Sequence, residues 1–180
     1  MRRCAIGLIW ILVALHFGCA DVGSSTESKN MKAHFTFQVE LAGYEFGQAD
    51  QKGETNYGTF VQSFDEFPWV EQIEKANKSK KVSPTLTVND NEKNEALWVS
   101  ATGDSNSHTF LIGHIYPKEF KGFLGFGKPK LKKWIEIYLT DNKEVVKECF
   151  KLFFDGDTNG LRQRYSRLEK YDEMESQIQD

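Results

Sequence analysis

The sequence has few of the residues that form covalent cross-links or carry out catalysis. It has three cysteines among 180 residues, and two of them, Cys4 and Cys19, lie in an N-terminal segment with the pattern of an export signal. The third, Cys149, has no partner for an intramolecular disulfide, so we expect an exported domain that is stabilised by its apolar core alone. Cys149 falls on the apolar side of a helical pattern, which favours buried packing over a role as nucleophile.

The motifs of common catalytic and metal sites are also missing. His34, His108 and His114 lie on different predicted strands or turns, with neither an H-x-H nor an H-E-x-x-H spacing, so we expect no zinc site. There is no G-x-S-x-G elbow, and G-F-L-G-F-G (122–127) lacks the lysine and hydroxyl residue that end a phosphate-binding loop. A net charge of −3 provides no field that would attract nucleic acid. These absences predict a protein that is not an enzyme, has no cofactor and binds no nucleic acid.

One stretch partly matches a calcium-binding loop. D-G-D-T-N-G (155–160) fits the first half of an EF-hand, but the twelfth position, which should supply a bidentate carboxylate, is Ser166. A turn between two helices explains the same residues, because Gly156 can end one helix and Asp157 or Thr158 can cap the next. We therefore expect a helix–helix turn there and no metal.

The N-terminal residues have the pattern of an export signal. Arg2 and Arg3 precede an apolar run of eleven residues (5–15), which is shorter than the ~20 residues that cross a bilayer. Cleavage before Cys19 would follow a sequence that partly resembles a bacterial lipobox and would allow this cysteine to be lipidated. Cleavage after Ala20 would instead release a secreted protein. We favour lipidation at Cys19 and expect an anchored protein on the periplasmic side of the cell envelope.

These features divide the chain into four segments. Residues 1–18 are the predicted signal peptide, and residues 19–32 are a polar tether without hydrophobic periodicity. We predict a single domain over 33–171 and a frayed tail over 172–180. Removal of the signal peptide, which carries two arginines and no acids, changes the net charge from −3 to −5.

Hydrophobic periodicity predicts an α+β fold. Alternating apolar and polar residues indicate strands, and short polar connections favour antiparallel neighbours over parallel crossovers. The expected fold is an antiparallel sheet of about five strands with helices packed on one face. The predicted strands are 33–41, 84–90, 96–102, 108–116 and 133–139.

Helices are predicted in two parts of the chain. Apolar residues at three- and four-residue intervals over 60–73 indicate an amphipathic helix that is interrupted at Pro68, after a polar loop over 47–58. In the last third, Asp141 has the position of a helix cap, and the apolar residues of 161–168 indicate a second C-terminal helix.

The stretch K-E-F-K-G-F-L-G-F-G-K-P-K-L-K-K-W (118–134) joins two predicted strands. Its six lysines and one glutamate give a local charge of +5 in an acidic protein. Its apolar side chains either fold back as a lid on the sheet or stay exposed, and exposed apolar patches usually mark binding surfaces. The lysines would attract an acidic partner or anionic headgroups. We predict a partner-binding surface made of Lys118, Lys121, Phe123, Leu124, Phe126, Lys128, Lys130, Lys132 and Lys133.

Size, export signal, α+β organisation and lack of catalytic residues together resemble the small exported immunity proteins that bacteria make against the toxins of neighbouring cells. The resemblance extends loosely over 33–170 and includes A-L-W-V-S (96–100), W-I-E-I-Y (134–138) and F-K-L-F-F-D-G-D (150–157). It implies a protein partner, a toxin whose active site the protein covers in the periplasm. The alternative is a structural or envelope-associated lipoprotein that contacts lipid or another envelope protein.

Overall fold

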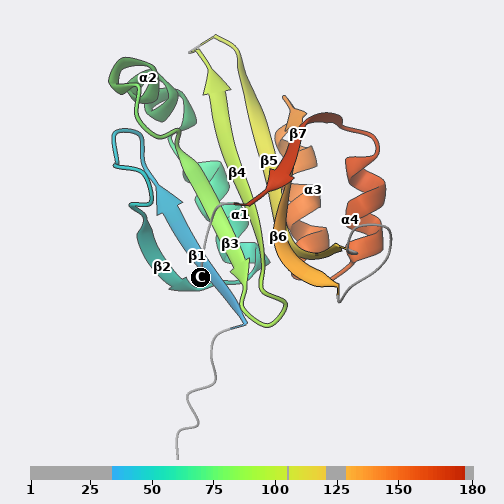
Figure 1. The fold of residues 1–180 in the computed structure, drawn as a ribbon. Coiled ribbons are helices and arrows are strands. Elements are labelled where there is room, and N and C mark those ends of the chain that lie inside the picture. The colour runs from blue at the N-terminus through green and yellow to red at the C-terminus, as the bar shows by residue number, and fades with distance from the viewer. Residues whose placement is uncertain (1–33, 105, 121–128, 177–180) are drawn as a thin grey trace, which may run out of the picture. The chain divides into compact units, whose positions relative to one another are not determined.

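The computed structural model describes residues 34–104, 106–120 and 129–176. These residues form an α+β fold with one seven-stranded antiparallel sheet and four helices (Figure 1). The strands are β1 (Phe35–Glu40), β2 (Asp50–Glu54), β3 (Thr85–Asp90), β4 (Glu95–Gly103), β5 (His108–Phe120), β6 (Lys130–Thr140) and β7 (Glu169–Glu175). The helices are α1 (Tyr57–Glu66), α2 (Trp69–Ser79), α3 (Lys143–Phe154) and α4 (Thr158–Tyr165).

The strand order in the sheet is β2-β1-β3-β4-β5-β6-β7, and all neighbouring strands are antiparallel. From β3 to β6 the order in the sheet follows the order in the chain, because short turns join these strands directly. The two pairs of helices are inserted before and after this four-stranded meander and pack on one face of the sheet (Figure 1).

The hydrophobic core lies between this face and the helices. Alternate residues of the strands, such as Leu86 in β3 and Ile112 in β5, are fully buried there. Phenyl rings dominate the helical side: the rings of Phe60 in α1 and Phe150 in α3 stack with their centroids 3.9 Å apart, and both are completely buried. Buried aromatic pairs of this kind contribute beyond the area that they remove from water.

The helix boundaries follow local signals. Helix α1 ends at Glu66 and α2 begins at Trp69, which confirms the predicted interruption at Pro68. Gly156, with φ of 70°, follows α3, and the Asp157 side chain accepts a hydrogen bond from Gly160 N at the start of α4. The helix–helix turn predicted for this stretch is therefore confirmed.

Several boundaries differ from the sequence-based expectation. The sheet has seven strands instead of about five, because the segment 47–58 contains β2 and the end of the chain contains β7. The expected tail from 172 onward is wrong as far as Glu175, which pairs with Trp134 of β6. The N-cap of α3 is Asn142 and not Asp141, since the Asn142 side chain accepts a hydrogen bond from Glu144 N.

Candidate functional site

The face of the sheet opposite the helices carries a second set of apolar side chains. In β4, Leu97 and Val99 point into the core, so Ala96 and Trp98 point to the other face. The register of the sheet places directly paired residues on the same face, and this continues the set across neighbouring strands. We call this surface the open face. Its apolar residues are Ala96, Trp98, Leu111, Ile115, Ile135 and Leu139.

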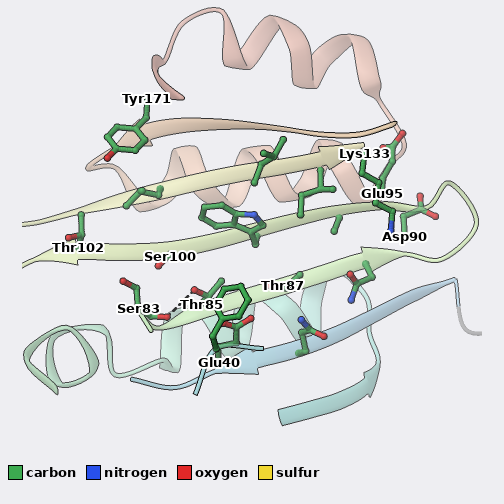
Figure 2. Close-up of a pocket in the computed structure, with 18 of the residues that line it drawn as sticks. Glu40, Ser83, Thr85, Thr87, Asp90, Glu95, Ser100, Thr102, Lys133 and Tyr171 are labelled. Carbon is green, nitrogen blue, oxygen red and sulfur yellow. Dashed lines mark hydrogen bonds between the residues drawn. The ribbon is translucent and has the colours of Figure 1, made fainter. Parts of the chain in front are cut away.

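The open face forms a hollow of about 1190 Å³. Its apolar floor is bordered by hydroxyl and amide side chains: Gln38, Thr85, Thr87, Asn89, Ser100 and Thr109. Figure 2 shows Glu40 and Ser83 on one side of the hollow and Lys133 and Tyr171 on the other. An apolar surface with a polar border can bind a partner by desolvation and can orient it by hydrogen bonds.

Trp98 forms the centre of the floor because its neighbour in β5 has no side chain. Trp98 pairs with Gly113 across the two strands. A Cβ atom added at Gly113 would lie 2.0 Å from Cε2 and 2.1 Å from Cζ2 of Trp98, so the indole ring lies flat across the glycine. Glycine in a strand interior often marks such a close approach.

Large apolar side chains are exposed around the hollow. Phe46, in the connection between β1 and β2, is 95% exposed, and Tyr171 of β7 is 62% exposed. Both line the hollow. Leu131 and Met174 are also exposed, and the register places them on the open face. Tyr171 is the additional residue of an irregularity in β7, because Ile137 pairs with Asp172 and Tyr138 with Lys170.

The charged residues of the hollow lie at its margins and are mostly acidic. Three acids, Glu40, Asp90 and Glu95, and one base, Lys133, contribute to its lining. Of these acids, Asp90 is buried, and the Glu95 carboxylate lies beside His114 on the helix side of the sheet. Burial raises the pKa of the Glu40 carboxyl above its ordinary value. Asp90 is fixed in the turn after β3, where its carboxylate accepts hydrogen bonds from the backbone N–H groups of residues 92 and 93.

The lysine-rich hairpin is only partly described. Lys121, Phe123, Leu124, Phe126 and Lys128 lie outside the described residues, as does Cys19.

The four described lysines of the hairpin do not share one surface. Lys118 and Lys132 pair with each other and therefore lie on the helix-side face, as does Lys130, whereas Lys133 lines the open face. Lys118 Nζ lies 4.3 Å from the ring centroid of Trp134, and Lys132 Nζ is 2.6 Å from Glu175 Oε2. Part of the lysine charge in this hairpin is therefore compensated by an aromatic ring and a carboxylate.

The other residues considered for chemistry lie apart from the hollow. Cys149 is fully buried in the core, and burial raises the pKa of its thiol to about 12, which keeps it protonated and unreactive. His34 is partly exposed beside Glu92, and His108 begins β5. His114 is buried on the helix side, where its Nε2 is 3.4 Å from Glu95 Oε2. The three histidines are thus separate.

The described residues contain neither a metal-binding cluster nor a membrane-spanning helix. No group of three or more histidine, cysteine, aspartate or glutamate side chains in this part of the chain is placed to hold a metal ion. No helix within the same ranges combines the length and the apolar character of a membrane span.

The sequence analysis did not predict the open face, although the pattern of apolar residues in the strands contains a signal of it. In β6, large apolar residues occupy both alternating sets: Trp134 and Tyr138 point to the helix side, and Ile135, Ile137 and Leu139 to the other. In the same way, A-L-W-V-S-A has no polar face. Continuous apolar runs are typical of strands that are covered on both faces. Among the described residues, the helices cover only one face of the sheet.

Comparison of the chain with models of known protein families, with curated proteins and with solved structures finds no match.

Proposed function

We propose that this chain is an exported, lipid-anchored binding protein that holds a basic protein partner on the open face of its sheet. The observation that carries the proposal is the size and composition of this face. Twenty-two residues line the hollow, and a standard protein–protein interface uses about 20–30 residues on each side. The volume of about 1190 Å³ exceeds the range of roughly 300–1,000 Å³ that is usual for small-molecule pockets.

The residue types also favour a protein partner. Interfaces are enriched in tryptophan, tyrosine, phenylalanine and methionine, and their centres are depleted of charge. The open face has Trp98 at its centre and Phe46, Tyr171 and Met174 around it. Large aromatic side chains in such positions supply most of the binding energy in many complexes.

The charge distribution favours a basic partner. The hollow has Glu40 at its margin, and the domain without residues 1–18 has a net charge of −5. Opposite charges around an apolar centre accelerate association and exclude partners of the wrong charge. This replaces the acidic partner that the lysine-rich hairpin alone would favour.

The immunity role follows as part of the same proposal. A partner seated across the open face would have its own contacting surface covered, so a toxin whose active site lies there would be inactive. Lipidation of Cys19 would keep the domain at the membrane on the periplasmic side, where such a toxin arrives.

The binding proposal can be tested by photo-cross-linking in intact cells. Benzoylphenylalanine replaces Phe46 or Tyr171 on the open face, and Val70 of α2, an exposed residue of the helix layer, serves as the matched control. We expect one basic protein to be cross-linked from both open-face positions and not from Val70, and the adduct to be lost when Trp98 is changed to alanine. Equal cross-linking from Val70, or no protein adduct from either open-face position, would contradict the proposal.

The nature of the captured molecule tests the immunity role. The partner expressed alone in the periplasm should stop growth, and co-expression of this chain should restore it. Growth that is unaffected by the partner would refute immunity and favour the envelope-associated role, as would adducts that contain phospholipid instead of protein.

Anchoring is tested separately by globomycin, which blocks the processing of bacterial lipoproteins. We expect the uncleaved precursor to accumulate in treated cells. Normal maturation under the drug, or unchanged membrane association of a Cys19→Ser variant, would refute lipidation.

A further inference from the structure

A second site lies on the opposite side of the sheet, under α4. Polar and titratable side chains come together here from β4, β5, β6 and α4. The inner part is a small cavity of about 40 Å³, lined by Glu95, His114, Thr158 and Leu161 together with four further residues. Those four are Tyr116, Glu136, Arg162 and Tyr165.

The same four residues also line an outer cleft of about 470 Å³. Ser166, Leu168, Tyr138 and Lys170 complete the cleft. Since both spaces share half of their lining, a ligand in the cleft can extend a small group into the cavity. The cleft falls within the range of roughly 300–1,000 Å³ that is usual for small-molecule sites.

Some side chains of this cluster are already paired by hydrogen bonds, whereas others can still bind a ligand. Glu136 is well occupied: it accepts hydrogen bonds from Tyr138 Oη at 3.2 Å and from Lys170 Nζ at 2.9 Å. Lys170 also binds Glu173, so this lysine is held by two carboxylates. The Glu95 carboxylate lies 3.4 Å from His114 Nε2.

Tyr165 is the least satisfied member of the cluster. Its side chain is 4% exposed, and its hydroxyl has no hydrogen-bond partner among the described residues. The ring is held firmly, because it stacks on Tyr138 with centroids 4.3 Å apart and lies 5.9 Å from the ring of His114. A buried polar atom without a partner destabilises the fold, so its presence in a native structure requires an explanation, and a ligand that supplies the missing hydrogen bond is one.

Arg162 provides the opposite charge at the mouth of the site. Its side chain is exposed, and it forms no ion pair with any residue in the described ranges. An arginine in this position can bind a carboxylate through two parallel hydrogen bonds. Deeper in the site, the Glu95 carboxylate and the Tyr165 hydroxyl can accept hydrogen bonds.

We propose that this pocket binds a small zwitterion, with its ammonium group in the cavity beside Glu95 and Tyr165 and its carboxylate at Arg162. The cavity is small, at about 40 Å³, so we expect it to admit a primary ammonium and to exclude the bulkier trimethylammonium group. The proposal does not depend on the open face: Glu95 is the one residue that lines both spaces, and its carboxylate lies on the helix side beside His114.

The test is a titration of the purified domain, followed by the NMR signals of the His114 and tyrosine rings. The probes form a series with growing charge separation: glycine, 4-aminobutyrate and 6-aminohexanoate. Butyrate and butylamine each lack one charge, and 4-(trimethylammonio)butyrate carries the bulky head group. We expect saturable binding of one or more primary zwitterions and at least tenfold weaker binding of the three controls, because each control loses a charge-assisted hydrogen bond or does not fit.

Variants identify the site. Tyr165→Phe and Arg162→Gln should each weaken binding about tenfold, whereas Arg167→Gln, an arginine outside the pocket, should bind as the wild type does. Arg162 is exposed, so its variant tests the proposal even if the Tyr165 variant is unstable. A Trp98→Ala variant should lose the partner of the open face and keep the zwitterion. Equal binding of butylamine, no saturation by any zwitterion, or binding that Arg162→Gln does not weaken would overturn the proposal.

Discussion

Replacement of Gly113 by alanine tests the centre of the open face at the level of single atoms. The added Cβ would lie 2.0 Å from Trp98 Cε2, and carbon atoms in contact prefer about 3.5–4.0 Å. The indole must therefore move by about 1.5 Å or rotate out of the hollow. Overpacking of this kind costs about 1–3 kcal/mol.

The effect of this substitution on the free energy of unfolding should reverse when Trp98 is absent. Gly113 is not among the glycines with positive φ, so alanine is compatible with its backbone and should stabilise the fold by about 0.4–1 kcal/mol through the unfolded state. We expect Gly113→Ala to lower the free energy of unfolding in the wild type and to raise it in a Trp98→Ala background. Urea unfolding followed by circular dichroism measures all four proteins. The same sign in both backgrounds would refute the placement of the indole over the glycine.

Three further predictions concern the fold. Asn142→Ala should lower the free energy of unfolding by about 1 kcal/mol in the same assay, and the adjacent Asp141→Ala should change it by less than about 0.5 kcal/mol; equal losses would contradict the cap. Because burial raises the pKa of Cys149 to about 12, Ellman's reagent at slightly alkaline pH should modify this thiol only as the protein unfolds, and rapid labelling of the native protein would contradict its burial. Burial also raises the pKa of Glu40, so the folded state binds the carboxyl proton more tightly than the unfolded state does. The contribution of Glu40 to stability therefore falls as the pH rises above 4.5, the ordinary pKa of glutamate. Glu40→Gln should therefore stabilise the protein increasingly as the pH rises through that range in urea titrations, and a pH-independent difference would contradict the burial of this carboxyl.

The sequence was sufficient to predict those helices and strands that pack one face against the core. The alternation in β1 and the three- and four-residue spacing in α1 and α3 arise from burial against a single core, and burial is what periodicity reports. The two missed strands, β2 and β7, lie at the edges of the sheet, and every residue of β7 is exposed. Backbone hydrogen bonds to β1 and β6 hold these two strands in the sheet. Because this pairing does not require buried side chains, the two strands show no alternation of apolar residues in the sequence.

The candidate site was harder to predict for a related reason. The apolar residues on both sides of β6 were visible in the sequence, but periodicity alone does not tell which side the helices cover. That choice depends on the packing of α1 and α3 against the sheet, which is a tertiary property. The lysine-rich hairpin was conspicuous by composition, but the strand register divides its described lysines between the two faces.

The most direct test of the account is a measurement of which methyl groups the partner shields from solvent. A gadolinium chelate in solution broadens the NMR signals of exposed methyl groups. In the free domain we expect it to broaden Leu111, Ile135 and Leu139 of the open face and to spare Leu97 and Ile112 of the core. Addition of the partner protein that photo-cross-linking identifies should restore the three open-face signals. If the partner binds and these signals stay broadened, the open face is not the binding surface.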